Sequence, residues 1–155
     1  MSDAIAAALS VSISELPAVH VAYLDCQVDA EQDNFRKIRA SFQRVQDWVR
    51  ERGYDPYTRL NIGALHAGEG PPSSYGCCVQ VPEDVQSGSE GIGIKELPGG
   101  RYAVVRIAKE PAIIGDSIDR FYQEYVPHNN LGIDGTRPIY EIYYVRTMEY
   151  CVPIV

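Results

Sequence analysis

Hydrophobic and polar residues follow one another in two series of segments that have the same order. Residues 19–26 alternate and are rich in residues that favour strands, as in a half-buried β-strand. In residues 33–52 the apolar side chains recur every three or four positions, which predicts an amphipathic helix that ends at Gly53. Residues 60–67 and 75–81 have the pattern of two more strands. The first part of the chain thus predicts the order strand, helix, strand, strand.

The second part of the chain repeats this order. Residues 101–108 predict a strand and residues 112–126 a helix, which Pro127 is expected to end. Residues 139–146 and 148–154 predict the last two strands. Each part is therefore expected to form a β-α-β-β unit, and the two units together an α+β fold with an antiparallel sheet and two main helices on one face.

The phrase Glu-Leu-Pro occurs at the start of both series, at residues 15–17 and 96–98. This spacing of about eighty residues is longer than the 20 to 50 residues of most solenoid repeats. We therefore interpret the chain as one small unit that was duplicated and fused, with halves at residues 15–82 and 91–155. Residues 92–97 predict an extra strand before the second unit. The seam between two such halves is a natural place for a ligand groove.

A chain of 155 residues is long enough for one domain with a sizeable core, expected here at residues 15–155. Residues 1–14 are expected to form a tail. Because this lead-in is too short for a helix-turn-helix, we expect no direct DNA binding by this chain. The net charge of −7 also opposes binding to a nucleic-acid backbone, although it is compatible with cationic small molecules. No run of 18 apolar residues is present, so no membrane span is expected.

The cysteines and histidines do not indicate a metal site. The three histidines have no ligand spacing, and the four cysteines have no Cys-x-x-Cys spacing and lie in apolar, strand-like contexts. We expect the cysteines to be reduced and buried in a cytoplasmic protein without metal or cofactor. These cysteines are Cys26, Cys77, Cys78 and Cys151.

Glu141 stands out in the comparison of the two halves. When Arg59 is aligned with Arg137, Glu141 corresponds to Gly63 in the equivalent strand. Alternation places Glu141 on the same strand face as apolar and aromatic neighbours, where a carboxylate is costly unless it is paired, solvated or used. It could pair with Arg101 or Arg106 or face water. Alternatively, it could form the floor of an aromatic pocket for a cation, with Gly63 leaving the space for the ligand.

Eleven tyrosines and one tryptophan could supply the walls of such a pocket. Aromatic rings around a carboxylate bind flat cations through stacking, cation–π attraction and a Coulombic contact. For each ring taken alone, packing in the core is an alternative. The candidate ligand-binding residues are the two near the helix ends, Trp48 and Tyr125, and the strand residues Tyr75, Tyr102 and Tyr143.

Several of these segments together resemble the GyrI-like small-molecule-binding domain, also known as the effector-binding domain of AraC-type and MerR-type multidrug regulators. The similar segments are Leu-Pro-Gly-Gly-Arg-Tyr-Ala-Val at 97–104, Tyr-Val-Pro at 125–127, Pro-Ile-Tyr-Glu-Ile-Tyr at 138–143, and residues 75–79 and 152–154. The resemblance covers residues 14–155. It implies a fused pair of SHS2-like β-α-β-β units, with a glutamate in the groove between the helices that engages cationic or polar aromatic ligands. Here that glutamate would be Glu141.

The chain departs from the family pattern at three places. A Gly-Pro-Tyr turn usually follows each repeated strand, whereas this chain has Cys-Gln-Val-Asp at 26–29 and Ala-Lys-Glu-Pro at 108–111. The tryptophan often found near the end of the second helix is Tyr125 here. These differences lie at the expected mouth of the groove and leave the class of ligand open.

Three functions are compatible with these observations. The first, which we favour, is a stand-alone module that senses or sequesters a hydrophobic, cationic aromatic compound. The second, implied by some relatives, is a hydrolase of cyclopropane-bearing or other strained genotoxins. In it Glu141 would direct water and Tyr143 or Tyr125 would donate a hydrogen bond, although the sequence has no Ser/His/Asp or Cys/His constellation. The third is a gyrase-binding or other protein-binding inhibitor that acts through its acidic surface. The partner of this chain could be another protein or a second copy of the chain in a homodimer.

Overall fold

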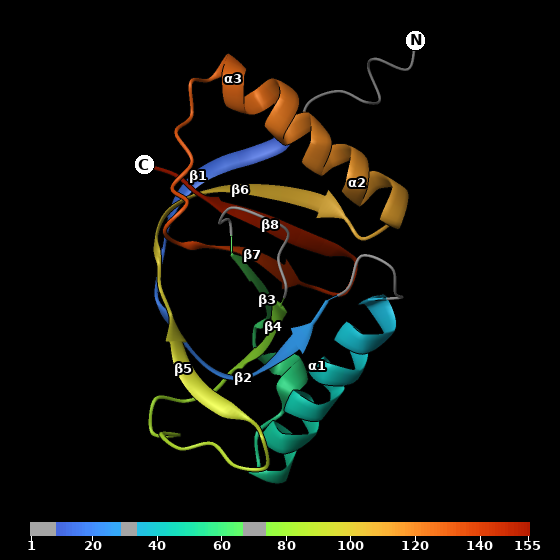
Figure 1. Ribbon diagram of the computed structural model, residues 1–155, viewed down its shortest axis with the longest axis vertical. Coiled ribbons are helices and arrows are strands. Elements are labelled where there is room, and N and C mark those ends of the chain that lie inside the picture. The colour runs from blue at the N-terminus through green and yellow to red at the C-terminus, as the bar shows by residue number, and fades with distance from the viewer. Residues whose placement is uncertain (1–8, 29–33, 67–73) are drawn as a thin grey trace.

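The computed structural model describes residues 9–28, 34–66 and 74–155 (Figure 1). Within these residues the chain forms one eight-stranded sheet and a few helices. The strands are β1 (Ser10–Leu16), β2 (Val19–Gln27), β3 (Asn61–His66), β4 (Ser74–Gln80), β5 (Gly93–Leu97), β6 (Gly100–Ala108), β7 (Pro138–Tyr143) and β8 (Thr147–Pro153). The helical segments are α1 (Asn34–Glu51), η2 (Pro56–Thr58), α2 (Pro111–Arg120), η3 (Phe121–Tyr125) and α3 (Val126–His128).

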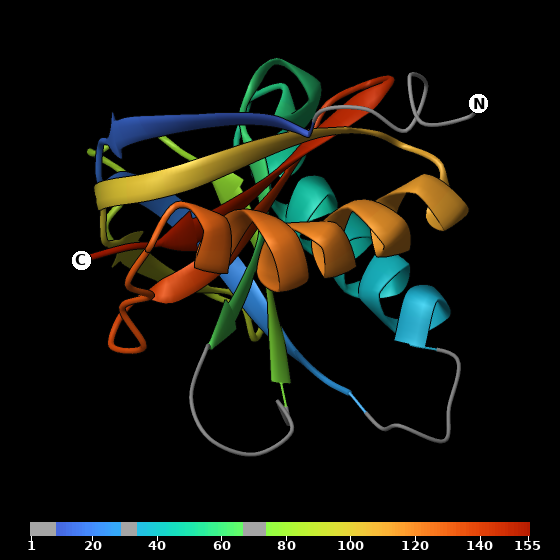
Figure 2. The ribbon, with the colours of Figure 1, turned by 90° about the horizontal axis from the view of Figure 1, so that it is seen from above.

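The sheet is antiparallel throughout and has the order β1-β6-β8-β7-β3-β4-β2-β5. The predicted α+β class is therefore confirmed, and both main helices cover the same face of the sheet (Figures 1 and 2). The element order β2-α1-β3-β4 recurs as β6-α2-β7-β8, as expected from the sequence. Strands β3 and β7 meet at the centre, where Gly63 lies directly opposite Glu141.

The two outer strands of the sheet cross from one half to the other. Strand β1 pairs with β6, although it is followed in the chain by β2, and β5 pairs with β2, although it is followed by β6. The two Glu-Leu-Pro segments lie at these crossings, and Gly99, directly after the second segment, packs closely against the first. A Cβ atom on Gly99 would be 2.1 Å from the carbonyl oxygen of Leu16, so only glycine permits this approach. Residues 10–14, which were expected in the tail, form most of β1.

The second helix is interrupted near its end. Residues 112–126 were expected to form one helix that Pro127 ends, but Pro127 lies inside the last turn, α3. Proline has no N–H to bond the carbonyl group of Gln123. The chain widens into a π-helix over η3, where the N–H of Val126 donates to the carbonyl oxygen of Phe121. The wider turn lets the helix continue past the proline.

Each face of the sheet has its own core. The face without helices is closed by the strands themselves, and its buried residues are Val21, Ile62, Cys78, Leu97, Tyr102, Val104, Tyr140, Ile142 and Cys151. On the other face, Phe121 of η3 is fully buried, and Val45, Trp48 and Val49 of α1 are buried against β2 and β4. All four cysteines are buried and free, and burial raises the pKa of Cys78 to about 12. None of the described helices is both long and apolar enough to cross a membrane.

Arg137 connects the loop before β7 to the start of β6 and to the residue after β8. Its guanidinium group donates to the carbonyl oxygens of Gly99, Arg101 and Ile154, and its Nε lies 2.9 Å from Oδ2 of Asp134. Asp134 also accepts hydrogen bonds from the hydroxyl and N–H groups of Thr136. These bonds fix the loop before β7 against the end of β8.

We predict that this loop loses stability in acid through Asp134. The hydrogen bonds from Thr136, followed by that from Arg137, lower the pKa of Asp134 from 3.8 to about 2. The unfolded chain therefore binds the proton more tightly, so this contribution to stability is present above pH 3.8 and is lost as the pH falls through about 2. Urea unfolding of Asp134→Asn and of the unchanged protein should differ near pH 5 and converge near pH 2. A difference that stays constant over this range would contradict the prediction.

Candidate functional site

Glu141 lies at the centre of the sheet face that carries the helices. One row of paired residues crosses six strands on this face, and its members are Val105, Tyr150, Glu141, Gly63, Cys77 and Leu24. Helix α1 packs on β2 and β4, and α2 packs on β6. The central strands β3 and β7 thus lie between the two helices (Figure 1), which places Glu141 between them as well.

Two tyrosine hydroxyl groups hold the Glu141 carboxylate. Tyr75 donates to Oε1 at 2.6 Å and Tyr143 donates to the same atom at 2.7 Å. The two phenol oxygens are themselves 2.5 Å apart. The three side chains come from β4 and β7 and form one compact cluster, which we call the Glu141 cluster.

Gly63 makes room for this cluster. A Cβ atom at position 63 would lie 1.8 Å from the hydroxyl oxygen of Tyr75. The sequence predicted that Gly63 leaves space for a ligand. This prediction is wrong, because the side chain of Tyr75 fills that space. Gly63 contributes to the site by letting Tyr75 reach across β3 to Glu141.

Both phenols act as donors because their protons are held firmly. Burial, and then the negative charge of Glu141, raise the pKa of Tyr75 and of Tyr143 well above its ordinary range. Both hydroxyl groups donate to Oε1, whereas Oε2 of Glu141 has no hydrogen-bond partner among the described residues. Oε2 is also absent from the fully buried polar atoms that lack a partner. This oxygen is the free acceptor of the site.

Further aromatic rings surround the Glu141 cluster. Phe42 of α1 makes edge-on contacts with Tyr75 and Tyr143, at centroid distances of 6.5 and 5.9 Å. On the other side, Tyr150 is next to Glu141 in the row and shares a hydrogen bond of 2.9 Å with Tyr122 of η3. The helical repeat of the sequence placed Phe42 and Tyr122 on core-facing stripes. That repeat carried no signal that these two would be the residues beside the carboxylate.

The structure does not bring three of the expected residues to the Glu141 cluster. Tyr102 lies on the opposite face of the sheet, stacked on Tyr140 at 5.3 Å and donating to the carbonyl oxygen of Pro138. The prediction for Tyr102 is therefore wrong. Trp48 donates to the hydroxyl oxygen of Ser89 and lies under the guanidinium group of Arg52 at 3.8 Å.

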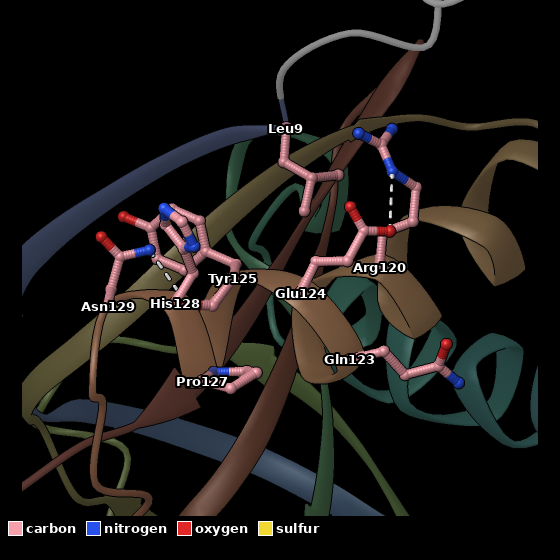
Figure 3. A pocket seen from close by; sticks show the side chains of 8 residues that line it. All are labelled: Leu9, Arg120, Gln123, Glu124, Tyr125, Pro127, His128 and Asn129. Carbon is pink, nitrogen blue, oxygen red and sulfur yellow. Dashed lines mark hydrogen bonds and ion pairs between the residues drawn. The ribbon is translucent and has the colours of Figure 1, made fainter.

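Tyr125 lines a different pocket, outside the second helix. Its ring stacks on Phe121 at 5.8 Å. The pocket, of about 710 Å³, lies between this helix and the start of β1 (Figure 3). Its other lining residues are Leu9, Arg120, Gln123, Glu124, Pro127, His128 and Asn129. Tyr125 and Trp48 thus have separate surroundings, although both were expected to line the pocket at Glu141.

The site contains no arrangement typical of a metal centre. Within the described part of the chain, no group of three or more His, Cys, Asp or Glu side chains is gathered closely enough to hold a metal ion. Glu141 makes no ion pair with any described Lys or Arg, and Arg106 pairs instead with Glu149 at 3.0 Å. The expected alternative, a pair between Glu141 and Arg106, is therefore wrong.

Residues 9–154 match the GyrI-like small molecule binding domain. The chain belongs to this family. Solved structures support the same fold at low sequence identity. The C-terminal domain of EcmrR is 13% identical, with a TM-score of 0.74 and coverage of 96% of this chain and 99% of that one. SAV2435, solved with tetraphenylphosphonium bound, is 12% identical, with a TM-score of 0.58 and coverage of 94% of both chains.

Two further relatives have different descriptions. A structure described as a hydrolase from Listeria innocua is 9% identical, with a TM-score of 0.65 and coverage of 94% of this chain and 92% of that one. The glycine–tRNA ligase beta subunit of Desulforapulum autotrophicum is 24% identical over 120 residues, which are 75% of this chain. The matched part is 17% of the length of that subunit.

Proposed function

We propose that this GyrI-like domain binds a hydrophobic, cationic aromatic compound against Glu141, and thereby senses or sequesters it. The observation that supports this proposal best is the carboxylate itself. Glu141 has no cationic partner among the described residues, and its Oε2 accepts no hydrogen bond from any of them. A carboxylate between aromatic rings attracts a flat organic cation both by its charge and through the ring faces.

The two tyrosines prepare the carboxylate for such a ligand. Because Tyr75 and Tyr143 fix Oε1, the carboxylate does not need to be ordered when a cation arrives, which reduces the entropic cost of binding. Phe42 of α1 and Tyr143 of β7 contact each other edge-on and could together form one aromatic wall for the ligand. The complex of SAV2435 with tetraphenylphosphonium, an aromatic cation, suggests a suitable probe.

We predict that Glu141→Gln weakens the binding of tetraphenylphosphonium about tenfold or more, because the amide removes the charge but keeps the shape. Isothermal titration calorimetry at low salt would measure the change. Glu96→Gln is the matched control, since it removes the same charge from β5, four strands away in the sheet. Equal affinities of the two variants for tetraphenylphosphonium would refute the proposal.

A hydrolase would use the same cluster differently. Oε2 of Glu141, which accepts no hydrogen bond from a described residue, could accept a proton from water, while Tyr143 keeps the carboxylate oriented. Glu141 and Tyr143 would then be the catalytic residues. Turnover of a cyclopropane-bearing electrophile by the unchanged protein and by Glu96→Gln, but not by Glu141→Gln, would favour catalysis over sequestration. Binding without turnover would favour the first proposal.

A further inference from the structure

A second cavity adjoins the Glu141 cluster and has the opposite electrostatic character. It has a volume of about 620 Å³ and opens between η2, the start of β3 and the end of β7. Its lining residues are Gln46, Tyr57, Thr58, Arg59, Leu60, Asn61, Gln80, Lys109, Tyr143, Tyr144 and Val145. We call it the Arg59 cavity. Tyr143 is part of both the Glu141 cluster and the Arg59 cavity. Its hydroxyl group donates to Glu141, and the centre of its ring lies 5.7 Å from the ammonium group of Lys109.

The charges that line the Arg59 cavity are all positive. Arg59 and Lys109 are its charged residues, and no Asp or Glu is among the described lining residues, although the whole chain has a net charge of −7. Neither cation makes an ion pair with a described carboxylate. A cationic cavity in an acidic protein is a site where an anion would be attracted locally.

Arg59 has unused hydrogen-bonding capacity. Its Nε is buried and has no hydrogen-bond partner, and its guanidinium group lies 5.0 Å from the ring of Tyr54. Because this Nε is enclosed by protein atoms, the two Nη groups are the donors of Arg59 that remain for a ligand, and neither donates to a described residue. The planar guanidinium group suits the paired oxygens of a carboxylate, sulfonate or phosphate.

Other donors point to the same chemistry. Lys109 donates to the carbonyl oxygen of Tyr144 at 2.9 Å, which leaves the remaining hydrogens of its ammonium group for a ligand. Oε1 of Gln80 accepts from the N–H of Leu60, and the amide nitrogen of Gln80 has no partner among the described residues. The rim is apolar: Tyr57, Tyr144 and Val145 are 70%, 41% and 91% exposed.

From these contacts we infer that the Arg59 cavity binds the anionic group of an aromatic organic acid. Arg59 and Lys109 would donate hydrogen bonds to the oxygen atoms of that group, and the exposed residues of the rim would pack against the aromatic rings of the acid. This inference does not depend on cation binding at Glu141. It assigns the neighbouring cavity to a ligand of opposite charge. Because Tyr143 is shared, a compound that carries both charges could reach both places.

Fluorescence titration with two matched probes tests the inference. The anionic probe is 8-anilinonaphthalene-1-sulfonate, and N-phenyl-1-naphthylamine is the same ring system without the sulfonate. We expect the protein to bind the sulfonate more tightly. Arg59→Gln should weaken that binding about tenfold, because it removes charge-assisted hydrogen bonds. Lys109→Gln should weaken it about threefold, because this lysine is more exposed to solvent. Neither change should affect the neutral probe.

Control variants separate the possible outcomes. Lys95 lies in β5, away from the Arg59 cavity, with its ammonium group 4.1 Å from the centre of the Tyr23 ring. Lys95→Gln removes a similar positive charge there and should leave the binding of the sulfonate unchanged. Arg59→Lys should restore part of it. Glu141→Gln should not weaken it, so a failure of the cation proposal would be distinguishable. If the sulfonate and the neutral probe bind equally well, or if Lys109→Gln and Arg59→Gln both leave sulfonate binding unchanged while circular dichroism shows a folded protein, the inference is wrong.

Discussion

Replacing Gly63 by alanine is expected to destabilise the protein by about 1–3 kcal/mol, although alanine normally suits a strand better than glycine. The added Cβ would overlap the Tyr75 hydroxyl, which lies 1.8 Å from its ideal position. Tyr75 is almost fully buried and cannot move aside freely. The variant should therefore also lose the hydrogen bond between Tyr75 and Glu141. Urea unfolding would measure the change in free energy.

Two controls isolate this contact. At Gly115, in the interior of α2, a Cβ would meet nothing within 4 Å, so Gly115→Ala should stabilise the protein by about 0.5–1 kcal/mol. In the Tyr75→Ala background, the additional cost of Gly63→Ala should largely disappear, because the overlapping atoms have been removed. If the full cost of Gly63→Ala persists without the tyrosine ring, Tyr75 is not its cause.

The second large effect is expected at Arg137. Replacement by methionine keeps much of the aliphatic stem but removes four hydrogen bonds, made to Asp134 and to the carbonyl oxygens of Gly99, Arg101 and Ile154. The side chain is 19% exposed, so water replaces these bonds incompletely. We expect a loss of about 2–4 kcal/mol in the free energy of unfolding, measurable by urea titration.

Arg50→Met serves as the control for loss of an arginine. Arg50 pairs with Asp47 at 2.9 Å, but the two side chains are 48% and 52% exposed. Exposed pairs of this kind contribute about 0–1 kcal/mol, so Arg50→Met should change stability little. Equal losses for the two arginines would show that the bonds of Arg137 to the three segments do not stabilise the fold.

The sequence predicted local elements well because their signals are local. Helix α1 was expected at residues 33–52 and is found at Asn34–Glu51, and Gly53 follows it with φ of +90°. Residues 10–14 also alternate serine with apolar residues, which is a strand signal. Their partner, β6, lies about ninety residues further along the chain, and no local pattern identifies so distant a pairing.

The site was predicted in part, and the failures have physical causes. Alternation correctly put Glu141 and Tyr143 on one face of β7. In β6, residues on both faces are apolar and buried, so alternation could not tell whether Tyr102 faces the helices or the opposite side of the sheet. Gly63 indicated a close approach to the backbone, but a glycine does not identify the atom that approaches. Only the three-dimensional register shows that this atom is the hydroxyl oxygen of Tyr75.

The crossing of β1 and β5 makes the two halves mutually dependent. Strand β1, which leads into β2, pairs with β6 on the far side of the sheet, and β5, which leads into β6, pairs with β2. Separating the halves would expose an unpaired edge on β6 and another on β2. We therefore expect the described sheet to unfold as one cooperative unit, because separating β3 from β7 would disturb both crossings. A ligand bound at Glu141, on the pair β3–β7, would consequently stabilise both halves at once.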